Sequence, residues 1–379
     1  MTAAGLIFSN IHDDAVSELT RMRTMASVPF GGRYRLIDFT LSNMVNAGIS
    51  KVGIVTSNNY RSLLDHIGTG KDWDLARRED GIKILPPNIT AYDSAVSADA
   101  AGTRLGALVG VINFIERCNE DVIVLSDCDT ICNISVADVL AFHKEKEAQV
   151  TVVTKKIADA ARLTFKNSII RTEPDGRITD VFAFSAANFY RAEDISTNIM
   201  VIDREYLLKR LYDARARGYT SFFHDIMAKR MGFDRYFAYA FDGYYSFVNS
   251  IPGYYASSMD LLDPAIRGEL FRTAARPIYT KVRNSAPTLY TDGCAVKNSM
   301  IADGCVIEGT VENSIVFRGA HIGKGSVVRN AVLMQDAYIG DNVNLNCVIA
   351  DKNAVIRDGV SLAGHKAMPF FLGKGMMLS

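Results

Sequence analysis

The C-terminal part of the chain, from about Pro287, carries a repeated spacing that few folds can accommodate. Aliphatic residues recur every 17 positions in two registers, which are Ile322, Ile339 and Ile356, and Val328, Leu345 and Leu362. Each member of the second register follows its partner by six residues, and Gly-, Asn- and Asp-rich corners lie between them. This pattern predicts a parallel β-helix, in which stacked coils share one continuous core. An antiparallel barrel with regular turns is the alternative.

The first 245 residues have a different pattern, in which short β-branched runs alternate with longer amphipathic stretches. The expected strands are Ala4–Phe8, Val52–Thr56, Val122–Leu125, Val150–Thr154, Ile199–Ile202 and Tyr236–Phe241. The expected helices are Asp38–Asn46, Arg61–His66, Leu105–Arg117, Val136–Lys146 and Arg204–Arg215. Apolar strands separated by helices predict an α/β, Rossmann-like domain with a mostly parallel sheet covered on both faces. Such sheets bind ligands at the carboxyl ends of their strands.

We therefore expect three segments. Residues 1–245 form the α/β domain, residues 246–286 form a helical and extended linker, and residues 287–379 form the β-helix. The linker is rich in tyrosine and proline, and a helix is expected over Gly253–Leu262.

The charge balance argues against several classes of partner. Lys plus Arg and Asp plus Glu both number 42, so the formal net charge is zero. A neutral chain has no overall attraction for nucleic acid or for an anionic membrane, so any anion site must be local. The N-terminus lacks the basic region of a signal peptide, and no apolar run approaches about 18 residues. We expect a cytoplasmic protein with six reduced cysteines, although Cys128 and Cys132 could approach each other in a turn.

The run Val28–Asn43 reads V-P-F-G-G-R-Y-R-L-I-D-F-T-L-S-N. It resembles the signature of the glucose-1-phosphate adenylyltransferases (ADP-glucose pyrophosphorylases). Gly102 and Thr103 stand where that family has its G-T-A-D-A nucleotide loop, and Gly70–Arg78 resembles GlgD-type subunits, which accompany a separate catalytic C-type subunit. The resemblance covers nearly the whole chain. It implies a nucleotidyltransferase domain followed by a left-handed β-helix.

The implied reaction joins glucose 1-phosphate to the α-phosphorus of ATP and releases pyrophosphate. It needs a phosphate cradle, a divalent metal held by carboxylates, and lysines for the remaining charge. Catalytic members follow the first strand with G-G-x-G-T-R-L, but here no glycine lies between Leu6 and Phe30, and Asp13, Asp14 and Glu18 fall in that region. Side chains at these positions would block the close backbone approach that wraps a triphosphate.

The lysines that the family uses are also replaced. Its K-R-A-K-P element becomes Met22–Ala26, with Met22 and Met25 at the two lysine positions, and we expect both methionines to pack in the core or at an interface. In its F-V-E-K-P element, which supplies a lysine to glucose 1-phosphate, Phe184 takes the lysine position. A neutral aromatic ring cannot replace that charge.

The metal carboxylates are incomplete as well. One family aspartate corresponds to Asp127 or Asp129, depending on where a one-residue insertion falls, and the other is replaced by Phe247. Magnesium usually relies on one or two carboxylates together with substrate phosphates. We therefore predict no catalytic residues here, only vestigial positions at Met25, Asp129, Phe184 and Phe247. This chain would require no cofactor, and Mg²⁺ would belong to the catalytic partner.

Three arginines remain for another purpose. By resemblance, Arg23 and Arg35 correspond to residues near the family's effector site, and Arg33 lies beside them. Arginine suits phosphate because its planar fork donates two parallel hydrogen bonds. Salt bridges to neighbouring carboxylates are the alternative for each of the three.

The resemblance implies a regulatory subunit that joins a catalytic C-type homologue in a mixed tetramer and modulates its kinetics, with a phosphorylated effector as a further ligand. The chain alone could also form a homo-oligomer. Two alternatives stay open, namely an active adenylyltransferase with an altered site and a stand-alone sensor of sugar phosphate or nucleotide.

Overall fold

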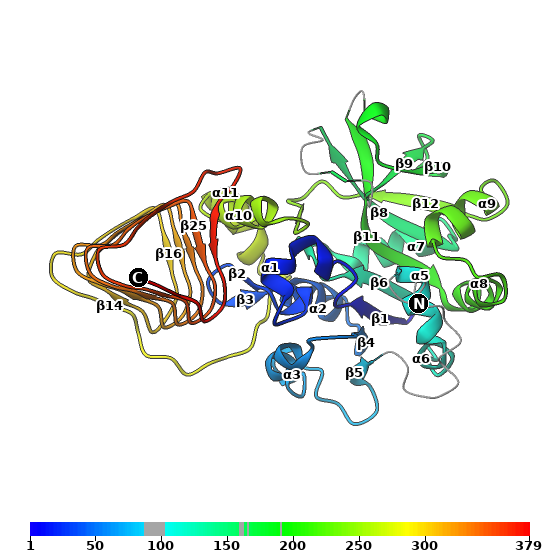
Figure 1. The fold of residues 1–379 in the computed structure, drawn as a ribbon. Coiled ribbons are helices and arrows are strands. Elements are labelled where there is room, and N and C mark those ends of the chain that lie inside the picture. The colour runs from blue at the N-terminus through cyan, green and yellow to red at the C-terminus, as the bar shows by residue number, and fades with distance from the viewer. Residues whose placement is uncertain (87–102, 159–162, 165–166, 190–191) are drawn as a thin grey trace.

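The computed structural model describes residues 1–379 apart from 87–102, 159–162, 165–166 and 190–191. An α/β domain is followed by two helices and then by a β-helix that ends the chain (Figure 1). The β-helix lies at one end of the molecule, and helices α10 (Ile251–Asp260) and α11 (Pro264–Phe271) lie between it and the α/β domain (Figure 1).

The α/β domain is built on a nine-stranded mixed sheet, in which β10-β9-β11-β6-β1-β4-β5 are neighbours in that order and β8 joins β11 to β12. Its strands are β1 (Ala3–Phe8), β4 (Lys51–Val55), β5 (Gly81–Leu85), β6 (Val122–Asp127), β8 (Val150–Ile157), β9 (Ser168–Thr172), β10 (Ile178–Ala183), β11 (Glu193–Asp203) and β12 (Tyr236–Ala240). Strands β6, β1, β4 and β5 pair in parallel, as expected. The expected strand Ile199–Ile202 is part of β11, which instead runs antiparallel to β6 and β8. The sheet is therefore mixed, with β11 and its antiparallel neighbours on one side of β6 and the parallel strands β1, β4 and β5 on the other.

Helices cover both faces of this sheet. They are α1 (Ser17–Thr20), α2 (Leu36–Asn46), α3 (Arg61–Ile67), α5 (Arg104–Gly110), α6 (Ile112–Glu116), α7 (Val136–Glu145), α8 (Arg204–Arg217) and α9 (Ala228–Arg230), the last preceded by a π-helical turn (Phe222–Met227). Along β1, Ile7 faces the apolar cluster of α2 and α7, whereas Leu6 and Phe8 face the cluster of α5, α6 and α8. This alternation confirms a sheet buried on both sides. The helix expected over Leu105–Arg117 is divided in two at Val111.

The β-helix has three stacks of short parallel strands. The first stack is β14 (Leu289–Tyr290), β17 (Val306–Ile307), β20 (His321–Ile322), β23 (Tyr338–Ile339), β26 (Val355–Ile356) and β29 (Met377–Leu378). The second is β15 (Ala295–Lys297), β18 (Thr310–Glu312), β21 (Val327–Arg329), β24 (Asn344–Asn346) and β27 (Ser361–Ala363). The third is β16 (Met300–Ile301), β19 (Ile315–Val316), β22 (Val332–Leu333), β25 (Val348–Ala350) and β28 (Phe370–Leu372).

Both 17-residue registers are confirmed by the pairing of these strands. Ile322 pairs with Ile339 and Ile339 with Ile356, while Val328, Leu345 and Leu362 stack in the same way. Because every pairing between these coils is parallel, the barrel alternative is wrong. The architecture is a left-handed hexapeptide β-helix.

Helix α10 ties the two larger parts together. The hydroxyl of Tyr254 donates to the carbonyl of Pro29 in the α/β domain at 2.7 Å, and the hydroxyl of Tyr255 donates to the carbonyl of Asn330 in the β-helix at 2.7 Å. Two small sheets complete this region, formed by β2 (Pro29–Phe30) with β3 (Tyr34–Arg35) and by β7 (Thr130–Ile131) with β13 (Ser246–Phe247). After α11, the chain runs extended to β14. The described part of the chain has no helix long and apolar enough to cross a bilayer.

Candidate functional site

A cleft of about 460 Å³ opens at the carboxyl ends of β1 and β6, where a sheet of this kind binds ligands. Its lining comes from six segments of the α/β domain: Ile11 and His12; Thr103, Arg104 and Leu105; Ser168 of β9; Ala183 of β10; Asn198 of β11; and Thr220 to His224. Of the predicted nucleotide loop, Gly102 lies outside the described residues. The hydroxyl of Thr103 caps α5 by accepting from the amide of Gly106 at 3.0 Å.

Charged side chains meet at the floor of this cleft. His12 Nε2 lies 3.0 Å from Asp127 Oδ2 and 3.8 Å from Asp129 Oδ2, and Arg104 donates from Nε to Asp127 Oδ1 at 3.2 Å and from Nη2 to Asp127 Oδ2. Burial acts to raise the pKa of Asp127, but the charge of Arg104 and the hydrogen bond from His12 hold it below its ordinary value. Asp129 has less compensation, so burial raises its pKa to about 6. The carboxylate of Asp127 is thus already neutralised by a cation that the protein supplies.

The segment that follows β1 uses its backbone amides internally. The amide of Met25 donates to Asp13 Oδ1 at 2.7 Å, the amide of Ala26 donates to the carbonyl of Ser9 at 3.1 Å, and the amide of Ala15 donates to the carbonyl of His12 at 3.0 Å. These amides are therefore not available to wrap a triphosphate. Burial raises the pKa of Asp13 to about 7.

The two methionines of this segment have different surroundings. Met25 is 1% exposed and packs in the main apolar core, as expected. Met22 is 61% exposed, so it does not pack in the core of this chain, and packing at an interface stays a prediction. Its neighbour Arg23 points into the β-helix, whereas the side chain of Met22 lies on the surface.

An apolar cluster includes Phe247 of β13 and two residues, Ile169 and Phe184, that directly follow the cleft-lining Ser168 and Ala183 in sequence. Its buried members are Leu163, Ile169, Phe184, Ile195 and Phe247. The ring of Phe184 meets that of Phe189 at 5.7 Å between centroids, and the ring of Phe247 meets that of Tyr245 at 5.8 Å. Phe184 and Phe247, which stand far apart in the sequence, are thus brought into one cluster that holds no charge.

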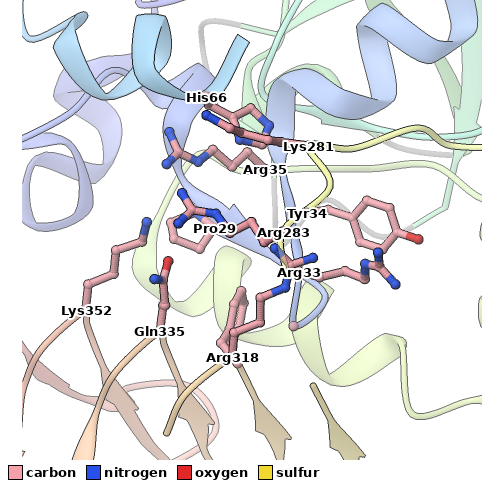
Figure 2. A pocket seen from close by; sticks show the side chains of 12 residues that line it. Pro29, Arg33, Tyr34, Arg35, His66, Lys281, Arg283, Arg318, Gln335 and Lys352 are labelled. Atoms are coloured by element: carbon pink, nitrogen blue, oxygen red, sulfur yellow. The ribbon is translucent and has the colours of Figure 1, made fainter. Parts of the chain in front are cut away.

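A second site lies where the α/β domain meets the β-helix, and we call it the cationic pocket. Figure 2 shows side chains from the β-helix rising toward those of the loop after β2 and of the extended linker. Its lining is Pro29, Gly32, Arg33, Tyr34, Arg35, His66, Lys281, Arg283, Phe317, Arg318, Gln335 and Lys352. Six of these are arginine or lysine, and none is a carboxylate.

Among the described residues, some cations of the pocket bond to a carbonyl or carboxylate oxygen, and others have no carboxylate nearby. Arg35 donates to the carbonyl of Ser62, Lys281 donates to the carbonyl of Asp65, and Arg318 pairs with Asp303 at 3.2 Å. Within the described residues, no carboxylate oxygen lies within 4.0 Å of the terminal nitrogens of Arg33, Arg283 or Lys352. Uncompensated cations of this kind favour a bound anion.

The crowding of positive charge also changes the acidity of these groups. Burial, followed by the charges of Arg35 and Arg23, lowers the pKa of Lys352 to about 7. Burial is the main reason that the pKa of Arg35 falls to about 10. An anion in the pocket would offset both effects.

The three predicted effector arginines separate in the structure. Arg33 and Arg35 line the cationic pocket. Arg23 does not line the pocket and is only 2% exposed. Its guanidinium donates from Nη2 to both carboxylate oxygens of Asp351, at 2.7 and 2.8 Å. For Arg23 the structure therefore shows the salt-bridge alternative.

Several residues of both sites were not predicted. Arg104 follows directly after the predicted loop residue Thr103, and the pair of acidic residues Asp127 and Asp129 was a signal that a cation lies nearby. Lys281, Arg283, Arg318 and Lys352 come from the linker and from two coils of the β-helix. No local motif marks them, because only the packing of the β-helix on the α/β domain brings them together.

Comparison with known proteins agrees with this architecture. Residues 16–181 match the family model described as nucleotidyl transferase, and residues 288–367 match that described as GlmU-like, C-terminal hexapeptide. The glycogen biosynthesis protein GlgD of Bacillus subtilis (strain 168) is 36% identical over 376 residues, which cover 98% of this chain and 96% of that protein. GlgD of Geobacillus stearothermophilus is 37% identical with the same coverage, and the glucose-1-phosphate adenylyltransferase of Thermosipho africanus is 33% identical over 86% of this chain.

The chain belongs to the glucose-1-phosphate adenylyltransferase family, with GlgD proteins among its relatives.

The geometry of the cleft also bears on the magnesium site that the glucose-1-phosphate adenylyltransferase family implies. By the resemblance, one aspartate position falls at Asp127 or Asp129 and the other at Phe247, which is 7% exposed within the apolar cluster. The adjacent Asp127 is bound by Arg104 and His12. These residues do not fit the two-carboxylate magnesium site that the family implies.

Proposed function

We propose that this chain is a regulatory, catalytically deficient subunit of glucose-1-phosphate adenylyltransferase in glycogen biosynthesis, acting in the cytoplasm. The observation that carries the proposal is the apolar cluster of Phe184 and Phe247, which occupies the places of a sugar-phosphate lysine and a metal aspartate. Phosphoryl-group transfer concentrates negative charge, and catalysis depends on cations and metal placed against it. A cluster of aromatic rings offers neither.

The partner would be a catalytic, GlgC-type adenylyltransferase, joined in a hetero-oligomer that we expect to be a tetramer. The relatives named GlgD and the relatives named glucose-1-phosphate adenylyltransferase support this choice of partner. Exposed apolar residues at the two ends of the β-helix also support association: Leu289 and Tyr290 are 56% and 51% exposed, and Met376 and Met377 are 55% and 57% exposed. Unpaired strands at the end of a β-helix need covering. A homo-oligomer would use the same surfaces.

The ligand of the regulatory site would be a phosphorylated metabolite bound in the cationic pocket. Because the chain has no net charge, the concentration of six cationic side chains there is a local specialisation. Arg33 and Arg35 offer planar donors, and Lys281, Arg283, Arg318 and Lys352 add charge from the linker and the β-helix. A molecule bound there would touch both parts of the chain and so be sensitive to their relative position.

Co-expression with a GlgC-type relative tests the proposal. We expect a mixed oligomer by light scattering, and we expect ADP-glucose synthesis by that oligomer to be abolished when a metal carboxylate is removed from the partner alone. A Lys352→Met change in this chain should then alter the response of the assembly to phosphorylated metabolites, while the exposed Lys324→Met serves as the matched control. If no mixed oligomer forms, the stand-alone sensor is favoured. If synthesis survives in the assembly with the inactivated partner, the active-enzyme alternative is favoured.

A further inference from the structure

The floor of the cleft combines the donors of a metal site with a cation that the protein itself supplies. His12 Nε2 and one oxygen each from Asp127 and Asp129 lie within 4.8 Å of one another. An imidazole with two carboxylates is a donor set that binds divalent metals such as Mn²⁺ or Zn²⁺. Asp127 is fully buried, Asp129 is 7% exposed, and the side chain of His12 is 18% exposed.

Arg104 takes up the charge that a metal would otherwise neutralise. Its guanidinium bonds both oxygens of Asp127, one of them the oxygen that His12 also approaches. An arginine stays protonated at any physiological pH, so this cation cannot be titrated away. It is also placed firmly, since Arg104 begins helix α5, which Thr103 caps, and its guanidinium lies 5.8 Å from the ring centroid of Phe8.

We infer that Arg104 is a built-in replacement for a divalent cation: it occupies Asp127 and closes a latent metal site formed by His12, Asp127 and Asp129. A metal ion would have to displace the guanidinium and then accept a positive charge as its neighbour, because the side chain of Arg104 is only 12% exposed. The repulsion between a metal ion and a neighbouring guanidinium is large in a site so little exposed to water. The inference does not depend on the chain being a regulatory subunit, since it concerns binding of a metal and not turnover.

Titration of the full-length chain with Mn²⁺, followed by the electron paramagnetic resonance of free Mn²⁺, tests the inference. We expect Arg104→Gln to bind one Mn²⁺ at least about tenfold more tightly than the unaltered chain, because the competing charge is gone. Arg104→Lys keeps the charge and should remain as weak as the unaltered chain. The double change Arg104→Gln with Asp127→Asn should lose the gained binding, which shows that the site is the one described.

Thermal unfolding gives a second measurement. Without metal, Arg104→Gln should have a lower melting temperature than the unaltered chain, because two buried carboxylates lose the neighbouring cation. Saturating Mn²⁺ should raise the melting temperature of Arg104→Gln back to that of the unaltered chain. The unaltered chain should show no such shift. If Arg104→Gln fails to fold, rescue of its folding by Mn²⁺ supports the inference and failure of Mn²⁺ to rescue it counts against it.

Two results would overturn the inference. One is tight Mn²⁺ binding by the unaltered chain that Asp127→Asn removes, since Arg104 would then not exclude metal. The other is a folded Arg104→Gln protein that binds Mn²⁺ no better than before, since Arg104 would then be only a structural partner of Asp127.

Discussion

The cleft and the cationic pocket both contain arginine, but the cleft places its arginine against a carboxylate, whereas the lining of the pocket contains no carboxylate. In the cleft, the guanidinium of Arg104 is bound to Asp127. Phe184 and Phe247, which by the resemblance take the places of a substrate lysine and a metal aspartate, pack in an apolar cluster. In the cationic pocket, Arg33, Arg283 and Lys352 have no carboxylate within 4.0 Å among the described residues. The difference teaches that an arginine or lysine marks an anion site only where the protein has not already supplied its counter-ion.

The largest effect is expected from trying to restore the cleft. The double change Phe184→Lys with Phe247→Asp returns two charges of the family pattern, but we expect turnover to remain at least about 10⁴-fold below that of an active relative, because the amides after β1 are still engaged and Arg104 still holds Asp127. A pyrophosphate-release assay measures this. Substantial turnover would show that the engaged amides after β1 do not prevent catalysis.

The next largest effect concerns Arg23 as a structural residue. Arg23→Met leaves the carboxylate of Asp351, 1% exposed, without its partner, and we expect the free energy of unfolding to fall by about 3–5 kcal/mol. Urea unfolding measures the change. Arg329→Met, which breaks an exposed pair with Glu312, should cost no more than about 1 kcal/mol and serves as the control. An Arg23→Met protein of unchanged stability but weakened anion binding would place Arg23 with the pocket instead.

A smaller effect is expected from a change in the cationic pocket, which should alter anion binding and not stability, in contrast to the Arg23–Asp351 ion pair. Lys352→Met should weaken the binding of sulfate, used as a simple dianion, by about tenfold, because one cation in a partly buried site is lost. It should not lower the free energy of unfolding, since the Lys352 ammonium is crowded by Arg35 and Arg23. Isothermal titration calorimetry and urea unfolding together give both quantities. Equal sulfate binding by Lys352→Met and Lys324→Met would contradict the assignment of the pocket.

The smallest effect is a pH dependence of the same binding. The pKa of Lys352 is lowered to about 7 in the folded chain, so Lys352 loses its proton as the pH rises through that value. The unfolded chain binds more protons than the folded chain from about pH 7 up to the ordinary lysine pKa, so this group makes stability rise with pH across that window. Sulfate affinity should do the reverse and fall several-fold between about pH 6 and about pH 8.5. The dependence should be absent in Lys352→Met, and its persistence there would assign it to another group.

The sequence was sufficient to predict the parts of the fold in which a local pattern repeats. The β-helix register followed from Ile322, Ile339 and Ile356, because stacked coils require like residues at like positions. The parallel part of the sheet followed from continuous apolar runs. The antiparallel course of β11 did not, because a buried strand has the same apolar composition whether its neighbours run parallel or antiparallel to it.

For the candidate sites too, the sequence was sufficient only where a local motif marks the residues. Phe184 and Phe247 were found as departures from a family pattern, but their packing in one cluster is a property of the folded chain. Arg33 and Arg35 were predicted from one dense motif, whereas Lys281 and Lys352 enter the cationic pocket from segments that carry no signature. Arg23 lies in the element Met22–Ala26 just before that motif, yet its partner Asp351 is more than three hundred residues away, so the sequence could not distinguish a ligand contact from a buried ion pair.

The central claim is that this chain does not itself join ATP to glucose 1-phosphate, and a turnover measurement on the purified chain tests it most directly. With ATP, glucose 1-phosphate and Mg²⁺ at saturating concentrations, we predict no release of pyrophosphate above that of a blank without protein. A GlgC-type relative assayed in parallel should release it readily. Sustained formation of ADP-glucose by this chain alone, abolished by Asp129→Asn, would contradict the account.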